Sequence, residues 1–360
     1  MEGRPSRKIS LRKQFWPALS LPENGLRKQN FHMDEANLQA PEDPVSTIWS
    51  QMLQAVIGIV LVVGTAFMLR YYRPPQENSE LQQQVRQLTQ QVDQLQQQQA
   101  MPAMVLNRYR NSIAYIFGIY HVGFSNQTPS LRARISGTGF VVADGMLATN
   151  RHVAEPWYGD TEAAALISQG ATPQLEELLA FFPGSPVPVN VTPAVFAAKG
   201  DLAILHVEGT GEARKLTALP LAGERPSPGD IVAVVGYPMG VLGMVAKSPP
   251  AVYERLALRR DDIHAANELA ALSLIRPSAT YGHLGDVVGD KLIYDAPTAH
   301  GGSGGPVFNS HAEVIGINAA YIDGFSGGTL GISVDALRPL ITAAKKKSFT
   351  SLPQDAHAAR

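Results

Sequence analysis

His300-Gly301-Gly302-Ser303-Gly304-Gly305-Pro306 places one serine among four glycines, within a segment that otherwise has the pattern of β-strands. Glycine tolerates positive φ and carries no side chain, so this stretch can turn sharply and aim several backbone N–H groups at one point. A nucleophilic serine needs such donors, because they stabilise the negative charge that develops beside it. A flexible linker or a hairpin turn has the same composition. Partners elsewhere in the chain must decide between these interpretations.

Two residues upstream supply the groups that a nucleophilic serine requires. His152 follows an apolar run within Thr149-Asn150-Arg151-His152-Val153, and Asp201 begins the apolar run 201–205. Both lie at the ends of expected strands. Serine catalysis needs an oxygen nucleophile, an imidazole that takes and returns its proton, and a carboxylate that fixes the imidazole tautomer. Each residue alone is weak evidence, but the chain order His152, Asp201, Ser303 is a known triad order.

The composition narrows the class of protein. The 360 residues carry a net charge of −1, with no Cys and nine scattered His. Nucleic-acid binders usually show a basic stripe, so we expect no nucleic-acid partner. Without Cys or clustered His we expect no disulfide, no metal site and no cofactor. Frequent Gly and Pro with short apolar runs after residue 104 predict a β-rich core.

The N-terminal part predicts a membrane anchor. Residues 1–47 mix charged and polar residues without an apolar period and are predicted to be disordered. Residues 48–70 form an apolar run with Trp49 and Tyr71 at its edges, which predicts a transmembrane helix in contact with lipid. The near flanks and the distal tail disagree about orientation. We expect the N-terminus inside, with the following domain on the periplasmic side of a bacterial inner membrane.

A Gln-rich linker, residues 71–104, follows the apolar run. Its apolar residues alternate four and three apart, at Leu81, Val85, Leu88, Val92 and Leu95. Val at a and Leu at d favours a parallel two-stranded coiled coil, and anchoring in one membrane raises the effective concentration of the two copies. The seam is shorter than usual, and a polar spacer without pairing is the alternative interpretation.

Residues 105–345 are expected to form the β domain, followed by a polar tail, 346–360. Two stretches have helical spacing and good helix formers, residues 161–182 and 251–275. We expect both to be helical insertions in loops of the β domain.

Three segments resemble the chymotrypsin-fold serine peptidases of the bacterial HtrA/DegP-like branch. Residues 136–153 (SGTGFVVADGMLATNRHV) resemble that family's GSGFVI…DGYILTNNHV segment, residues 201–205 (DLAIL) its DLAVLK, and residues 294–318 its TDA…GNSGGP…GEVIGIN run. Together these motifs are specific. The resemblance covers residues 110–340. It implies an all-β fold of two six-stranded β-barrels with helical loop insertions, preceded by the transmembrane helix and the coiled-coil-like linker.

The resemblance also assigns a role to each matched position. Ser303 would be the nucleophile, His152 the general base and acid, and Asp201 the orienting carboxylate. The backbone N–H groups of Gly301 and Ser303 would form the oxyanion hole.

The specificity pocket follows from the same resemblance. Pro297, six residues before Ser303, would lie at its base, and Leu330 would narrow it. This uncharged lining predicts a small or medium apolar side chain before the cleaved bond. Gly302 departs from the family, which has Asn or Asp there, and this predicts a looser oxyanion loop. We also expect no PDZ module after residue 345, so that tethering and oligomerisation fall to the N-terminal helix.

The expected function is that of a membrane-anchored serine endopeptidase, acting on misfolded or membrane-proximal polypeptides through an acyl-enzyme. A homo-oligomer is expected, a dimer from the seam or a trimer from the family. One alternative is a catalytically latent binding or regulatory protein with a protease fold. Another is an α/β-hydrolase esterase, because Ser303 also fits Gly-x-Ser-x-Gly. That fold requires a helix directly after the serine and the order Ser, Asp, His, whereas Pro306 and a strand-like run follow here.

Overall fold

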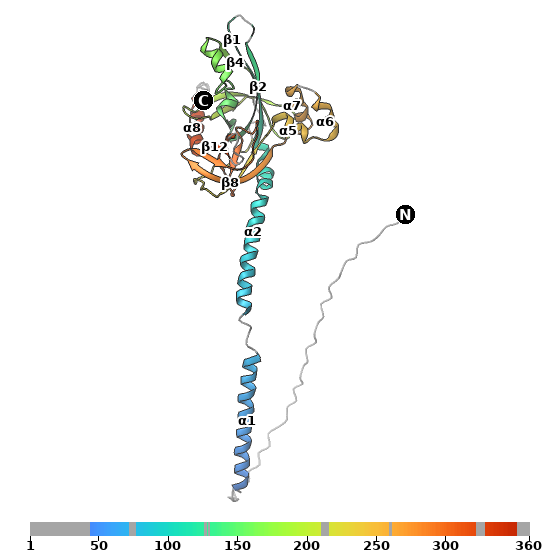
Figure 1. Ribbon diagram of the computed structural model, residues 1–360, viewed down its shortest axis with the longest axis vertical. Helices are drawn as coiled ribbons and strands as arrows, with labels where there is room; N and C mark the ends of the chain where they lie inside the picture. The colour runs from blue at the N-terminus through green and yellow to red at the C-terminus, as the bar shows by residue number, and fades with distance from the viewer. Residues whose placement is uncertain are drawn as a thin grey trace, which may run out of the picture. The chain divides into compact units, whose positions relative to one another are not determined.

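The computed structural model describes residues 44–71, 77–125, 128, 130–209, 216–258, 261–321 and 328–350 (Figure 1). The chain divides into two units, residues 1–80 and 81–360. Most of the expected disordered tail, residues 1–43, lies outside the described residues, as does the end of the polar tail, 351–360.

The first unit contains helix α1, Pro44–Tyr71. Within it, the 24 residues Ile48–Tyr71 have a mean hydropathy of 2.4, and none of their most apolar window is buried. A core helix of a soluble domain would be mostly buried, whereas this helix is long and apolar enough to cross a membrane. Its bounds agree with the expected span, residues 48–70.

Helix α2, Glu77–Tyr109, is longer than the sequence pattern predicts, because it continues through Pro102. The seam residues on its first part are exposed, whereas Met101, Val105 and Tyr109 are buried in the main core. Proline inside a helix removes one hydrogen bond and favours a kink. Burial of this last part offsets that cost, and the Tyr109 ring stacks on Phe308 with centroids 5.7 Å apart.

Twelve strands in the described part of the second unit form two closed antiparallel barrels of six strands each. Around the first barrel the order is β1 (Ile113–Gly123), β2 (Leu131–Ala143), β3 (Met146–Thr149), β6 (Ala203–Val207), β5 (Val189–Phe196) and β4 (Thr172–Phe181). Around the second it is β10 (Pro306–Phe308), β11 (Val314–Tyr321), β12 (Thr329–Ser333), β9 (Lys291–Tyr294), β8 (Ser278–Val288) and β7 (Ile231–Gly236). The expected pair of six-stranded barrels is thereby confirmed.

One expected helical insertion is wrong in its second half. Residues 161–168 form helix α4 (Thr161–Ser168), but residues 172–181 form strand β4. The segment contains good helix formers, yet it pairs with β1, and residues 178–181 are buried. Without this strand the first barrel would not close, so tertiary pairing overrides local propensity.

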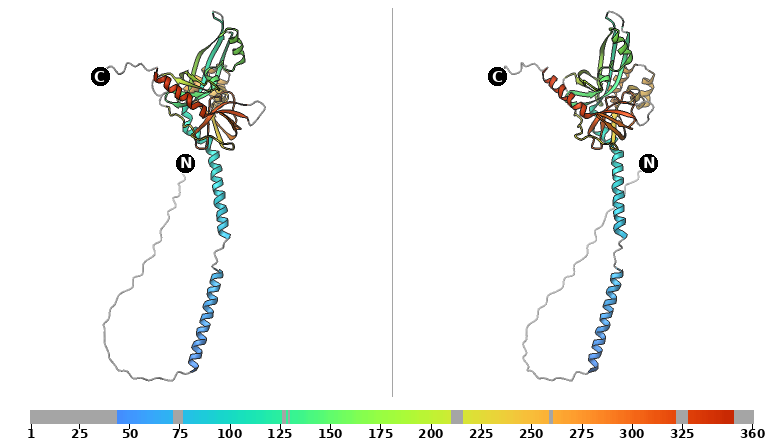
Figure 2. Two further views of the ribbon diagram at one scale, coloured as in Figure 1. Left: turned by 90° about the vertical axis from the view of Figure 1, so that its left-hand side faces the viewer. Right: turned by 60° about the vertical axis from the view of Figure 1, so that its left-hand side comes forward.

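The second expected insertion is helical. It contains α6 (Pro250–Ala257) and α7 (Asp262–Ala271), and α5 (Gly240–Ala246) precedes them. These helices gather on one side of the barrels, on the side away from α8 (Val334–Thr350) (Figures 1 and 2). Helix α8 packs on β5 and β6 of the first barrel and on β11 and β12 of the second, and thus ties the two barrels together.

Buried tyrosines join the barrels directly. The Tyr237 hydroxyl, at the end of β7, donates to the Ile113 carbonyl of β1 over 2.9 Å. Its ring lies 5.6 Å from that of Tyr115, centroid to centroid. Burial raises the pKa of Tyr115 to about 12 and the pKa of Tyr237 well above its usual value, so both hydroxyls stay protonated well above neutral pH.

Candidate active site

His152 and Asp201 form a two-point contact. His152 lies in α3 (Arg151–Ala154), a single turn of helix directly after β3. Its backbone N–H donates to Asp201 Oδ1 over 2.9 Å, and its ring Nδ1 lies 2.6 Å from Asp201 Oδ2. With Nδ1 as the donor, this contact leaves Nε2 as the basic ring nitrogen. The Asn150 side chain also donates to the Asp201 carbonyl over 2.7 Å, so hydrogen bonds fix both the side chain and the backbone of Asp201.

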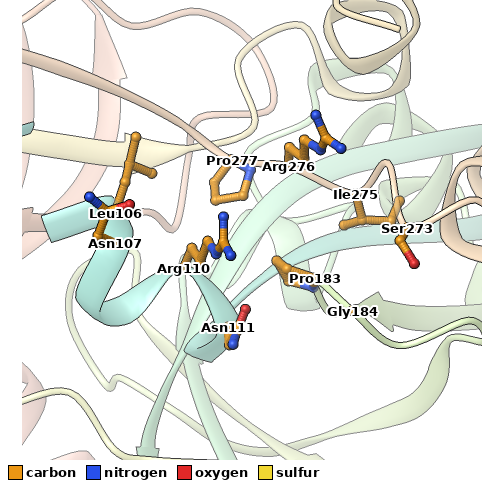
Figure 3. Close-up of a pocket in the computed structure, with 10 residues that line it drawn as sticks. All are labelled: Leu106, Asn107, Arg110, Asn111, Pro183, Gly184, Ser273, Ile275, Arg276 and Pro277. Carbon is orange, nitrogen blue, oxygen red and sulfur yellow. The ribbon is translucent and has the colours of Figure 1, made fainter. Parts of the chain in front are cut away.

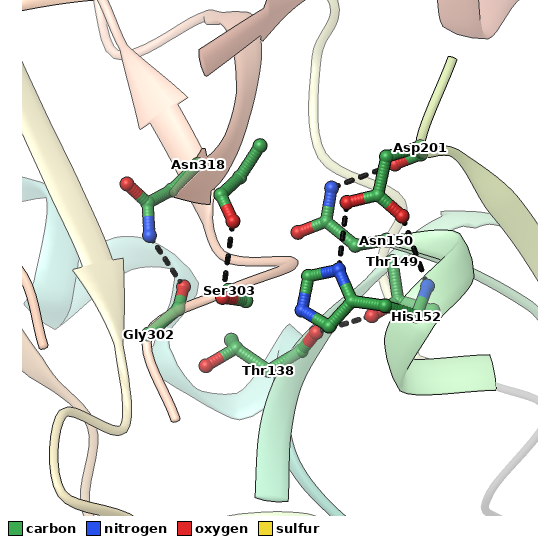
Figure 4. Close-up of polar contacts among 9 residues, drawn as sticks. Thr138, Thr149, Asn150, His152, Asp201, Gly302, Ser303 and Asn318 are labelled. Carbon is green, nitrogen blue, oxygen red and sulfur yellow. Dashed lines mark hydrogen bonds and ion pairs between the residues drawn. The ribbon is translucent and has the colours of Figure 1, made fainter. Parts of the chain in front are cut away.

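Thr138 connects Ser303 to the strand that precedes His152 (Figure 4): its N–H donates to the Ser303 carbonyl over 2.8 Å, and its carbonyl accepts from the Thr149 hydroxyl of β3 over 2.7 Å. It belongs to the loop before β10, whereas His152 belongs to α3 and Asp201 precedes β6. The ring nitrogen of His152 that does not face Asp201 is turned toward the side where Ser303 lies (Figure 4). The Ser303 hydroxyl donates to the Ala319 carbonyl of β11 over 3.2 Å. The described contacts therefore join His152 to Asp201 directly, whereas the pairing of Ser303 with His152 remains a prediction.

We call residues 299–306 the serine loop. Hydrogen bonds fix it along its length: Gly302 N–H donates to the Ala299 carbonyl over 2.9 Å, and Gly305 N–H donates to the Gly302 carbonyl over 3.1 Å. Gly304 N–H donates to the Asn318 carbonyl, and Asn318 N–H to the Gly305 carbonyl, each over 2.8 Å. Gly304 has φ of 86°, and a Cβ there would collide with the Thr138 carbonyl, so this turn requires glycine.

Hydrogen bonds support the serine loop at Gly302, the position where the sequence predicts a looser loop. The Gly302 carbonyl accepts a second hydrogen bond, from the Asn318 side-chain amide over 2.9 Å. A Cβ at position 302 would lie 2.5 Å from Thr298 Oγ1, so an Asn or Asp would not fit without a shift. The buried Asn318 amide of β11 therefore supports the loop at Gly302, and the Thr298 side chain would have to move to admit a Cβ there.

The two predicted oxyanion donors are unpaired. Among the residues that the structure describes, neither the Gly301 nor the Ser303 backbone N–H has a hydrogen-bond partner. The His300 carbonyl accepts from Met239 N–H over 2.6 Å. In a trans peptide the N–H points opposite the carbonyl, so this contact fixes the direction of Gly301 N–H. Two unpaired N–H groups therefore lie on either side of Gly302, and their role as an oxyanion hole remains a prediction.

Two residues that support the serine loop were not predicted from the sequence. Thr138 and Asn318 are both fully buried, and both hydrogen-bond the serine loop. The Asn318 Oδ1 accepts from the Tyr294 hydroxyl over 2.8 Å, and burial raises the pKa of that hydroxyl, which keeps it a donor. Thr138 lies in the motif 136–153 and Asn318 in the motif 294–318. Their hydrogen bonds to the serine loop are visible only in the structure.

Of the two expected pocket residues, Pro297 lies two residues before the serine loop in the chain, and Leu330 lies on β12, which pairs with β11. Pro297 is exposed, and its carbonyl accepts from the Thr280 hydroxyl over 2.7 Å. Leu330 is partly buried on β12, opposite Ile293 of β9. Their role in specificity remains a prediction.

A cavity of about 500 Å³ lies elsewhere, between the end of α2, the turn after β4 and the segment before β8 (Figure 3). Leu106 and Pro277 belong to its lining, together with the side chains of Arg110 and Arg276. None of the three predicted catalytic residues lines it, so its size does not make it the catalytic site. No group of three or more metal-ligating side chains occurs within the described ranges.

Comparison with known proteins identifies the domain. Residues 137–317 match the family model described as a trypsin-like peptidase domain. The chain is 33% identical over 205 residues to a protein of Rhizobium meliloti named "Probable periplasmic serine endoprotease DegP-like", a match that covers 56% of this chain and 31% of that protein. A protein of the same name from Chlamydia trachomatis is 28% identical over 208 residues, covering 57% and 32%. The chain thus spans about a third of the length of these relatives.

Among solved structures, the serine endoprotease from Yersinia pestis aligns with a TM-score of 0.44 and 17% identity, over 68% of this chain and 66% of that one. The family match runs from within β2 to within β11 and includes Thr138, His152, Asp201 and Ser303. The chain belongs to the trypsin-like peptidase family.

Proposed function

We propose that this chain is a serine endopeptidase of the DegP/HtrA type, which cleaves polypeptides through His152, Asp201 and Ser303. The observation that carries the proposal is the two-point contact of Asp201 with His152, beside a serine in a fixed glycine loop. Membership of the trypsin-like peptidase family supports it, and so do the DegP-like relatives, which are named as serine endoproteases.

In the proposed reaction, His152 Nε2 takes the proton of the Ser303 hydroxyl as its oxygen attacks the scissile carbonyl. The hydroxyl must first turn from the Ala319 carbonyl, to which it donates in the free protein. Asp201 holds the Nδ1–H tautomer and stabilises the imidazolium that forms. His152 then returns the proton to the leaving amine, which leaves an acyl group on Ser303. Water, activated by the same imidazole, hydrolyses that ester and regenerates the enzyme.

The tetrahedral intermediates carry negative charge on the former carbonyl oxygen. We assign its stabilisation to the Gly301 and Ser303 N–H groups, because both are unpaired in the described structure and lie beside the nucleophile. Removal of one such donor typically lowers kcat by about 10²- to 10³-fold.

For specificity we propose a small or medium apolar side chain before the cleaved bond. Pro297 and Leu330 carry no charge that would bind Lys or Arg, and the hydrogen bond from Thr280 holds the Pro297 carbonyl in place. Substrates would be misfolded or membrane-proximal polypeptides, in agreement with an anchored peptidase.

We further propose that α1 anchors the chain as a single span in the bacterial inner membrane, with residues 81–360 on the periplasmic side. The apolar composition of Ile48–Tyr71 supports the span, and the names of the DegP-like relatives support the compartment. A protease-cleavable tag at Arg360 that proved accessible only from the cytosol would contradict this orientation. The exposed seam of α2, at Val85, Leu88 and Val92, would pair two copies.

Cleavage of unfolded casein by the detergent-solubilised full chain tests the proposed chemistry. We expect His152→Ala to lose most activity, and Asp201→Asn to lose about 10⁴-fold, the size of effect that follows replacement of an orienting carboxylate by its amide. His311→Ala and Asp144→Asn, which change exposed residues of the same types, serve as controls and should cleave like the wild type.

Each outcome separates the candidates. Wild-type rates in His152→Ala or Asp201→Asn, with the fold intact by circular dichroism, would contradict the role assignment. The two antiparallel barrels exclude the α/β-hydrolase alternative. Hydrolysis of short acyl esters without any cleavage of polypeptide would contradict the endopeptidase proposal. Absence of both activities under every condition tried would favour a latent binding or regulatory protein.

A further inference from the structure

Thr138 on β2 contacts the serine loop from the opposite barrel. Its side chain is fully buried, and its hydroxyl donates to the Gly301 carbonyl over 2.7 Å. Its backbone N–H donates to the Ser303 carbonyl over 2.8 Å. Figure 4 shows Thr138 close to Ser303, on a strand of the first barrel.

The two residues that Thr138 contacts, Gly301 and Ser303, are the two whose N–H groups are unpaired. Gly301 and Ser303 each have a free N–H in the described structure, and each has its carbonyl bound by Thr138. No side chain at position 302 can help to hold them, because glycine stands there. One residue of the first barrel therefore holds, by their carbonyls, both residues that would supply the oxyanion hole.

The Thr138 hydroxyl is itself fixed from the other side. It accepts from the Tyr237 backbone N–H over 3.1 Å, while the Thr138 carbonyl accepts from the Thr149 hydroxyl over 2.7 Å. A hydroxyl accepts and donates at the same time, so it can bridge Tyr237 N–H to the Gly301 carbonyl. Serine retains both functions, whereas valine has nearly the shape of threonine but neither function. Loss of the bridge leaves a buried donor and a buried acceptor without partners.

We propose that Thr138 is a positioning residue for the reaction. Its hydroxyl fixes the Gly301–Gly302 peptide, while the Met239 contact fixes the preceding peptide, which carries the Gly301 N–H. Together the two contacts hold the Gly301 backbone in the conformation that presents its N–H to the oxyanion site. This inference rests on the proposed peptidase function. It places one determinant of the oxyanion hole on the first barrel, although the loop that carries the hole belongs to the second. Any displacement of β2 relative to the serine loop would then weaken stabilisation of the transition state more than binding of the substrate.

Comparison of Thr138→Val with Thr138→Ser in the full-length protein tests the proposal. For Thr138→Val we expect kcat on a fluorogenic peptide to fall by about 10- to 10²-fold, somewhat less than the loss of a whole oxyanion donor, with KM nearly unchanged. Thr138→Ser should restore most of this loss. Ser136→Ala is the matched control: it removes a hydroxyl two residues away on β2 that contacts Tyr115 and not the serine loop.

A second readout separates positioning from general stability. A peptide boronic acid forms a tetrahedral adduct with a serine nucleophile, whereas the matching peptide amide binds without that geometry. Thr138→Val should lose affinity for the boronic acid by a factor similar to its loss in kcat, and little affinity for the amide. If Thr138→Val does not fold, Thr138→Ala removes the same hydroxyl without adding a methyl group in its place, and is measured in the same way.

Several results would overturn the proposal: wild-type kcat in folded Thr138→Val, an equal loss in Thr138→Ser, or equal losses of affinity for the boronic acid and the amide. Fluorophosphonate labelling of the wild type is measured in parallel. Absence of labelling means that the proposed peptidase function itself has failed. Labelling of the wild type, together with an active Thr138→Val, means that only the role of Thr138 is wrong.

Discussion

At the scale of single residues, Asn318 explains how the serine loop stays ordered with glycine at position 302. Its amide donates to the Gly302 carbonyl over 2.9 Å and to Thr298 Oγ1 over 3.0 Å, and its Oδ1 accepts from the Tyr294 hydroxyl. A buried amide with all of these contacts satisfied holds its neighbours in one arrangement. Thr298 occupies the space that a side chain at position 302 would need.

Gly302→Ala tests this account of the loop. The added Cβ would lie 2.5 Å from Thr298 Oγ1, so the loop must shift and the Gly301 and Ser303 N–H groups must move with it. We expect kcat to fall by about 10- to 10²-fold, up to the range seen when an oxyanion donor is lost. Gly223→Ala is the control, because nothing lies within 4 Å of a Cβ at that position. A wild-type kcat in Gly302→Ala would show that the Thr298 side chain does not restrict the residue at position 302.

At the scale of elements, short apolar runs with turn residues between them predicted a β-rich core, and the resemblance to the chymotrypsin-fold peptidases predicted the two six-stranded barrels. The motifs around His152 and Asp201 predicted two residues that are in direct contact. The helical interpretation of residues 172–182 failed because Leu175 and its neighbours favour a helix in isolation, whereas pairing with β1 makes them a strand. The contact of Thr138 with Gly301 joins residues 163 positions apart. A contact over this separation leaves no local sequence pattern. The residues that support the serine loop could therefore be identified only from the structure.

The continuation of α2 beyond Pro102 was also not predicted from the sequence, because proline usually ends or kinks a helix. Met101 and Met104 lie on the same helix, but Met101 is 2% exposed and Met104 is 42% exposed. Met101→Ala should lower the free energy of unfolding by about 2–5 kcal/mol, the range for removal of a buried side chain of this size. Met104→Ala should change it by less than about 0.5 kcal/mol. Urea unfolding measures both, and equal effects would mean that residues 101–109 are not part of the folded domain.

At the scale of the whole molecule, two buried tyrosines join the two barrels, and a third supports the serine loop through Asn318. Tyr115 and Tyr237 lie where β1 and β7 meet, and Tyr294 lies beneath Asn318 in the second barrel. Burial raises the pKa of all three phenols above the usual value of 10.0. The folded protein therefore keeps protons that the unfolded chain releases.

This difference predicts the response to alkaline pH. Stability present below pH 10.0 should fall as the pH rises toward about 12, the pKa of Tyr115, because the unfolded chain ionises first. Urea unfolding at several values of alkaline pH, with tyrosinate absorbance as a second signal, measures the effect. Tyr115→Phe keeps the ring but removes one titrating group, so it should lose less stability over this range. An unfolding midpoint independent of pH above 10.0 would contradict the burial of these hydroxyls.

The central claim is that His152 and Asp201 activate Ser303 as a nucleophile. The most direct measurement is reaction of the full-length protein with a fluorophosphonate probe, followed by mass spectrometry of the labelled peptide. The account predicts one adduct, on Ser303, that is absent from Ser303→Ala and forms much more slowly in His152→Ala. Labelling at another residue, or equal labelling of the wild type and Ser303→Ala, would contradict it.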